Sequence, residues 1–154
     1  MLSTFKSLSY RLHKTLGLAT LCLFGASVCT IALADTWPQF RGPHRDGKSA
    51  EKGIWKKITD ADPSLVWMAE GVGAGYASVS VTNDRLYTSG NVGNAQVVSA
   101  LSLVDGKVVW SAPISEGAPK HGYEGSRTTP TVDGERLYVV GSGGSIVCLS
   151  SQDG

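Results

Sequence analysis

The chain has 154 residues, and its 14 Lys and Arg nearly balance its 13 Asp and Glu, giving a net charge of +1. A nucleic-acid partner would need a clustered basic face to displace the counterions of the phosphate backbone, so we expect none here. The 19 glycines, with no long segment of helical period, predict many tight turns between short strands and therefore an all-β fold.

The first 34 residues predict a signal peptide rather than part of the fold. An uncharged stretch over residues 16–33 follows a basic start, and Ala32-Leu33-Ala34 supplies the small residues that signal peptidase accepts, so cleavage is expected after Ala34. The basic residues are Lys6, Arg11 and Lys14. We expect a signal helix, a periplasmic or secreted product and no stable membrane insertion after cleavage. An uncleaved anchor is the alternative, because the 18 residues of the stretch would just span a bilayer.

The part after Ala34 has few features that point to a compartment or a reaction. Its 11 Lys and Arg and 13 Asp and Glu give a net charge of −2, and Cys148 is its only cysteine, so it forms no internal disulfide. Because Cys148 lies in an apolar strand pattern, we expect it to be a small core residue. Residues 35–63 are predicted to form an extended segment that precedes the repeats.

A repeat of about 50 residues organises the rest of the chain. Residues 78–87 align with 129–138 at an offset of 51, and 100–106 align with 148–154 at an offset of 48. A longer loop over residues 90–97 is expected to account for the difference. A period of this length that contains only strands and turns is typical of a four-stranded propeller blade.

The strand pattern predicts one complete blade and parts of two others. In the complete copy, alternation with a period of two predicts strands over residues 78–82, 85–90, 97–102 and 108–112. Residues 64–67 are expected to form the outer strand of an earlier blade, because Val66-Trp67 matches Val109-Trp110. The predicted fold is therefore all-β, a partial propeller of about two antiparallel blades and the end of another over residues 64–154. Because a propeller closes with about four to eight blades, we expect the chain to be a fragment of a longer protein.

The motif Ala100-x-Ser102-x-x-x-Gly106-Lys107-x-x-Trp110 resembles the tryptophan-docking motif of pyrroloquinoline-quinone (PQQ) propellers, Ala-x-Asp-x-x-x-Gly-x-x-Trp. The resemblance implies that the indole of the fourth strand packs between neighbouring blades and that the glycine permits the turn before it. Trp67 matches Trp110 at an offset of 43 and is expected to dock in the same way. Only Ser102 departs from the motif, and the loss of the charge-assisted bond of Asp predicts a looser corner.

The opening of the segment after the signal, Trp37-Pro38-Gln39-Phe40-Arg41-Gly42-Pro43-His44-Arg45-Asp46-Gly47, resembles the start of secreted PQQ-like propeller proteins. These are often described as similar to BamB, the propeller subunit of the outer-membrane β-barrel assembly machine. The resemblance implies an exported, non-enzymatic scaffold that binds proteins or ligands through loops on its faces.

The alternative implied by the same resemblance is part of a PQQ-dependent dehydrogenase. Such an enzyme needs calcium ligands, a catalytic Asp and cofactor contacts, which would lie in blades outside this chain. No catalytic or metal-binding residue is assigned in the sequence, and no cofactor is expected in this part, whereas the full-length enzyme would hold PQQ and calcium. Asp residues at the turns are expected there for backbone reasons.

Three residues are candidates for a surface that faces the propeller channel. Arg127 lies in the 122–129 loop, which leads into an innermost strand, and there it would meet a carboxylate ligand or a quinone. A structural ion pair is the favoured alternative for its side chain. Tyr76 and Tyr123 are expected near the channel mouth as well, and as aromatic platforms they would also suit a sugar- or polymer-binding module.

Overall fold

The structure, a computed structural model, describes residues 36–53, 64–118 and 122–154. The chain divides into two units, Met1–Ile31 and Ala32–Gly154, and all described residues belong to the second. The predicted signal helix and the cleavage site after Ala34 lie outside the described residues. Within the described ranges the protein is all-β, with seven strands and no helix long and apolar enough to cross a membrane.

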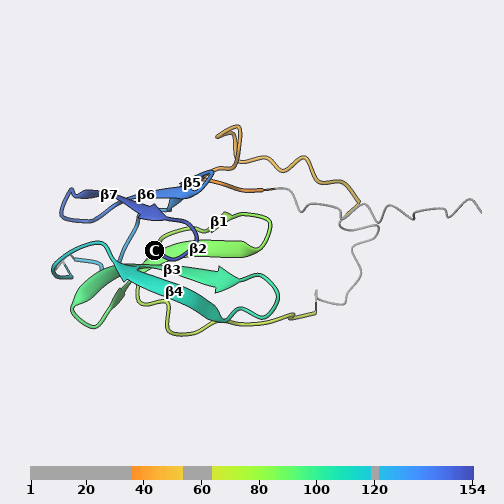
Figure 1. Cartoon of the computed structure of the whole chain (residues 1–154). Helices are drawn as coiled ribbons and strands as arrows, with labels where there is room; N and C mark the ends of the chain where they lie inside the picture. Colours follow the sequence, from red (N-terminus) through yellow and green to blue (C-terminus); the bar gives the residue numbers. More distant parts are fainter. Residues whose placement is uncertain (1–35, 54–63, 119–121) are drawn as a thin grey trace, which may run out of the picture. The chain divides into compact units, whose positions relative to one another are not determined.

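The first repeat folds into a four-stranded antiparallel sheet, as predicted (Figure 1). Its strands follow one another in chain order as β1 (Ser80–Val81), β2 (Arg85–Val92), β3 (Ala95–Ser102) and β4 (Val108–Pro113). Strands β2 and β3 extend further than the sequence indicated, because Val92 pairs with Ala95 across a tight turn. Residues 90–97 are therefore the end of a hairpin rather than a loop.

The second repeat folds into a three-stranded antiparallel sheet with the same order. Its strands are β5 (Thr131–Asp133), β6 (Arg136–Val140) and β7 (Ile146–Ser150). Tyr138 pairs with Cys148 in this sheet, as Tyr87 pairs with Ala100 one repeat earlier. The two sheets are therefore successive copies of one blade pattern.

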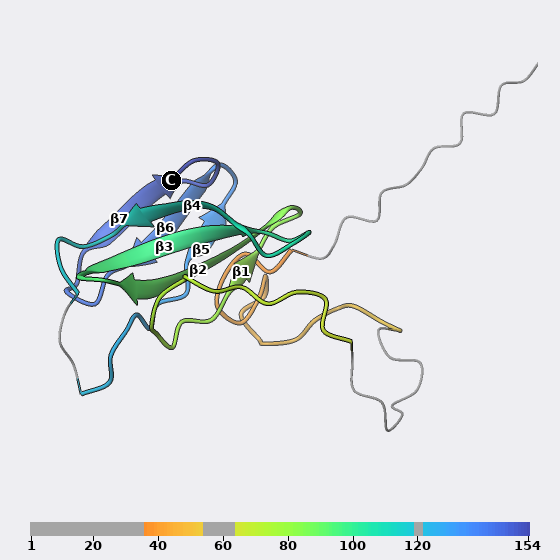
Figure 2. The same cartoon turned by 90° about the horizontal axis from the view of Figure 1, so that it is seen from below.

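The two sheets lie one over the other (Figures 1 and 2), and an apolar layer between them forms the core of the described part. Alternate residues of a strand point to the same face, so Leu137 and Val139 of β6 both reach this layer. The buried members are Tyr87, Val98, Ala100 and Ile114 from the first repeat and Val132, Leu137 and Val139 from the second. Because each sheet buries this face against the other, the two repeats stabilise each other.

A buried amide joins the hairpin ends of the two sheets. The Gln96 side chain is fully buried, its Nε2 donates to Ser142 Oγ at 2.6 Å, and its Oε1 accepts from the Ser142 N–H at 2.7 Å. Ser145 Oγ also donates to the carbonyl oxygen of Ile114 at 3.3 Å. Because a buried polar group is costly unless it is paired, these bonds favour a single register between the two sheets.

The segment before the repeats contains a turn that joins the edge strands of both sheets. Trp37 exchanges two backbone hydrogen bonds of 2.8 Å with Val81 of β1, and the N–H of Val132 in β5 donates to the carbonyl oxygen of Pro38 at 2.7 Å. Residues 39–47 then fold back on themselves, so this part of the segment is not simply extended. The contact satisfies backbone groups that edge strands would otherwise expose.

Two of the sequence predictions are wrong. Residues 64–67 do not form a strand, because a strand needs a partner and no described residue provides an earlier sheet for them. Cys148 is exposed rather than part of the core. It takes the position of Ala100 in the repeat, but its face of the second sheet points away from the apolar layer, whereas the face that carries Ala100 is covered by that sheet.

Truncating Leu137 tests the layer between the sheets. Leu137 is 0% exposed, so Leu137→Ala should lower the free energy of unfolding by about 2–5 kcal/mol, as is typical of a large-to-small change in a core. Leu65 is 77% exposed, and Leu65→Ala should change it by less than about 0.5 kcal/mol. Urea unfolding measures both, and equal effects of the two substitutions would contradict the assigned core.

Candidate functional site

Trp67 lies against the corner between β3 and β4, which comprises residues 102–107. Its indole Nε1 donates to the carbonyl oxygen of Leu103 at 3.0 Å. A Cβ atom placed on Gly106 would come within 2.5 Å of the indole ring, and the φ of Gly106 is 69°. Glycine is therefore required at this corner both for the backbone conformation and for the approach of the ring.

Trp110 repeats this arrangement one blade later. A Cβ atom on Gly154 would come within 2.9 Å of its ring, and Tyr87 lies beside it with the ring centroids 6.0 Å apart. The hydroxyl of Tyr87 donates to the carbonyl oxygen of Ser151 at 3.0 Å, which ties the first sheet to the second corner. Ser151 corresponds to Leu103 in the repeat, but its carbonyl oxygen accepts from Tyr87 and not from the indole. The Trp110 Nε1 is buried and has no hydrogen-bond partner in the described part of the chain.

The corner itself is held by short local contacts. Ser102, which replaces the Asp of the docking motif, accepts a hydrogen bond from the N–H of Val104 at its Oγ, at 3.2 Å. Lys107 Nζ lies 2.7 Å from Asp105 Oδ2. The hydrogen bond from the Lys107 side chain, followed by one from Ser102, lowers the pKa of Asp105 from 3.8 to about 2. Asp105 and Lys107 therefore form an ion pair within the turn.

The three predicted channel-facing residues lie together on one surface. The rings of Tyr76 and Tyr123 meet edge to face with their centroids 6.4 Å apart. The Arg127 guanidinium lies 6.0 Å from the centre of the Tyr123 ring, and its Nη2 donates to the carbonyl oxygen of Tyr123 at 3.1 Å. Together they line a shallow pocket, which we call the Tyr–Arg cluster. No carboxylate among the described residues forms an ion pair with Arg127, so the expected structural ion pair is not observed there.

Close packing of two loops supports the Tyr–Arg cluster. The N–H of Tyr76 donates to the carbonyl oxygen of Ser126 at 2.6 Å, where Gly75 and Ser126 form a parallel bridge. A Cβ atom on Gly75 would lie 2.6 Å from that oxygen, so only glycine permits this approach. Below the bridge, the hydroxyls of Ser126 and Ser89 share a buried hydrogen bond of 2.7 Å. The loops that precede the two blades are therefore fastened to each other and to β2.

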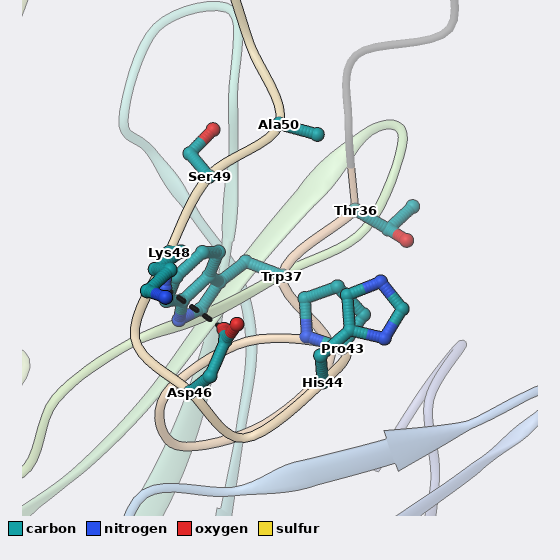
Figure 3. A pocket seen from close by; sticks show the side chains of 8 residues that line it. All are labelled: Thr36, Trp37, Pro43, His44, Asp46, Lys48, Ser49 and Ala50. Carbon is teal, nitrogen blue, oxygen red and sulfur yellow. Dashed lines mark hydrogen bonds between the residues drawn. The ribbon is translucent and has the colours of Figure 1, made fainter.

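A second hollow lies beside Trp37 in the turn of the N-terminal segment (Figure 3). The Trp37 ring packs on Gly42, where a Cβ atom would come within 2.7 Å of it. Asp46 points into the hollow, and its Oδ1 accepts from the N–H of Lys48 at 3.0 Å. The lining residues are Thr36, Trp37, Pro43, His44, Asp46, Lys48, Ser49 and Ala50. No pocket was predicted in this segment from the sequence, although its Trp, Gly and clustered charges were a signal.

Within residues 36–53, 64–118 and 122–154, no three His, Cys, Asp or Glu side chains lie together in a way that would hold a metal ion. His44 stands at the hollow beside Trp37, while His121 lies outside the described residues. The candidate binding sites among the described residues are the Tyr–Arg cluster and the turn of the N-terminal segment.

One protein-family model matches this chain. Its description is outer membrane protein assembly factor BamB, and the match covers residues 51–154, which is more than half of the chain. No curated protein matches the chain. The matched range includes both sheets and the Tyr–Arg cluster, whereas every residue that lines the hollow of Figure 3 precedes it.

Replacing Gly106 by Ala tests the docking of Trp67. Gly134 is the matched control, because both glycines have positive φ, 69° and 59°, and a left-handed Ala costs about 1–2 kcal/mol at either position. At Gly134 no atom lies within 4 Å of an added Cβ, whereas at Gly106 it would enter the indole ring. Gly106→Ala should therefore lower the unfolding free energy further and change the tryptophan fluorescence. Equal losses in the two variants would show that Trp67 does not dock there.

Titration of Asp105 tests the corner. The carboxyl should titrate at about 2, below its ordinary 3.8, in a carbon-13 NMR experiment. Because the folded pKa is the lower one, this contribution to stability is fully present above pH 3.8 and is lost as the pH falls through about 2. Lys107→Ala should move the pKa of Asp105 back toward 3.8, and by more than Ser102→Ala does. An Asp105 pKa that ignores Lys107→Ala would rule out this arrangement.

Proposed function

We propose a function on one premise: this chain belongs to the family of the outer membrane protein assembly factor BamB. The chain is a propeller-repeat scaffold that acts after export, in the periplasm or outside the cell. It binds a protein partner through the loops that precede its blades. The Tyr–Arg cluster is the contact surface. Membership of the family supports the scaffold, and the geometry of the cluster supports the place of binding.

The observation that carries the proposal is the exposure of two tyrosines on a fixed support. Tyr76 and Tyr123 are 66% and 70% exposed, although tyrosine is a residue of intermediate burial in folded proteins. Tyr and Arg are enriched among the residues that dominate binding energy at protein interfaces. Their loops are already fastened by the Gly75–Ser126 bridge, so a partner would order few additional atoms on binding.

Export is supported by the first 34 residues. The basic start, the uncharged stretch over residues 16–33 and the small residues before Asp35 have the order that signal peptidase substrates share. An exported location also fits Cys148 as the only cysteine after Ala34, because a single thiol cannot mispair within one chain in an oxidising compartment.

Site-specific photocrosslinking tests the contact surface. A benzophenone amino acid replaces Tyr123 in the full chain, which is expressed in the organism that naturally makes it. Illumination should then give one adduct of defined mass. The same amino acid at Val104, which is 87% exposed at the β3–β4 corner, is the matched control and should give none. Tyr76 should give the same adduct as Tyr123, because the two rings touch.

Removing the Arg127 guanidinium distinguishes a specific contact with a partner from crosslinking by random collision. Arg127→Ala in the Tyr123 crosslinking variant should reduce the adduct about tenfold, since a charge-assisted hydrogen bond contributes about 1.5–3 kcal/mol. Adducts of equal yield at Tyr123 and Val104, or a yield that is unchanged by Arg127→Ala, would contradict the proposed surface.

A further inference from the structure

A hollow with a lining different from that of Figure 3 lies between the N-terminal turn and the second sheet. It is lined by Gln39, Phe40, Arg41, Arg45 and Thr131, and we call it the arginine pocket. Two arginines from positions four residues apart thus line one hollow. Phe40, 62% exposed, adds an apolar wall, and Thr131 of β5 adds a hydroxyl.

The backbone of the turn presents both arginines in an unusual conformation. Arg41 and Arg45 have φ of 65° and 59°, and they are the only residues other than glycine with positive φ in the described ranges. Side chains with a Cβ atom disfavour this region, so such residues persist where surrounding contacts hold them. Here the N–H of Gly47 donates to the Arg41 carbonyl at 3.0 Å, and the N–H of Arg45 donates to Gly42 at 3.2 Å.

The guanidinium groups are oriented by neutral partners. Arg45 Nε donates to Gln39 Oε1 at 3.0 Å, and Arg41 Nη2 lies 3.5 Å from the carbonyl oxygen of Asp46. Neither arginine has a carboxylate partner in the part of the chain that the structure describes. Each therefore keeps donors available in a pocket whose other polar groups are an amide and a hydroxyl.

The turn is also anchored to the sheets on both sides. Trp37 is bonded to Val81 of β1, and Pro38 accepts from Val132 of β5, next to Thr131. The two arginines are thus placed at the edge strands of successive blades by contacts that do not involve their own side chains. A receptor that is fixed before its ligand arrives loses less entropy on binding.

We propose that the arginine pocket binds the oxyanion of a small molecule, a phosphate or a carboxylate group held between Arg41 and Arg45. The planar fork of donors on a guanidinium group can bind two oxygens of a carboxylate or a phosphate at once, and Phe40 would contact the apolar part of the ligand. This site goes beyond the proposed protein-binding function, because it uses other residues and another class of ligand.

Titration of the purified full chain with two probe anions tests the site. The Nε–Hε signals of all arginines are followed by nitrogen-15 NMR while inorganic phosphate or citrate is added at constant ionic strength maintained with chloride. The signals of Arg41 and Arg45 should shift saturably with at least one probe, and the probe that acts identifies the oxyanion. The signal of Arg136, an exposed arginine of β6, should not saturate.

Two variants and a control complete the test. Arg45→Gln should weaken binding about tenfold. Arg41→Gly removes the guanidinium while it relieves the left-handed backbone, so this variant should fold at least as well and still lose binding. Arg136→Gln should change affinity less than twofold. The proposal is overturned if neither anion gives saturable shifts, if Arg136 responds like Arg41 and Arg45, or if Arg41→Gly binds with unchanged affinity.

Discussion

Burial of the apolar layer between the two sheets is the interaction on which the other features depend. Each large side chain that it removes from water, such as Leu137 or Tyr87, contributes about 1.5–3 kcal/mol. In a single sheet these apolar side chains would be exposed to water, so neither repeat is expected to keep its strands without the other. The Trp110 contact at the second corner and the Gln96 amide act on top of this layer, because they require the sheets to be already stacked.

The same stacking fixes where binding residues lie. The two loops that precede the first strands of successive blades meet because their sheets are in contact. Gly75 lets the loops approach closely, since a Cβ atom at this position would collide with the other loop. Tyr76, Tyr123 and Arg127 lie together because they are close in the chain to the Gly75–Ser126 bridge, where the two loops meet. The N-terminal turn depends on stacking in a different way, because it bonds to Val81 of one sheet and Val132 of the other.

The sequence was informative where structure depends on local pattern. The repeat offset and the period of two predicted the sheets. Tyr76, Tyr123 and Arg127 were predicted separately as residues near the channel, and the structure brings them together at one pocket. Three features could not be predicted from the sequence. The exposure of Cys148 depends on which face of its sheet is covered, residues 64–67 have no strand partner, and nothing in the identity of Arg41 or Arg45 signals a left-handed backbone.

The central claim is that the two repeats are separate stacked sheets, and proton NMR contacts at the second corner test it most directly. Gly154 and Trp110 are 44 residues apart in sequence, and they approach each other only if the first sheet packs on the second. Stacked sheets predict nuclear Overhauser effects between the Gly154 α-protons and the Trp110 ring. A Trp110 ring with the shifts of a free indole and no contact to Gly154 would contradict it.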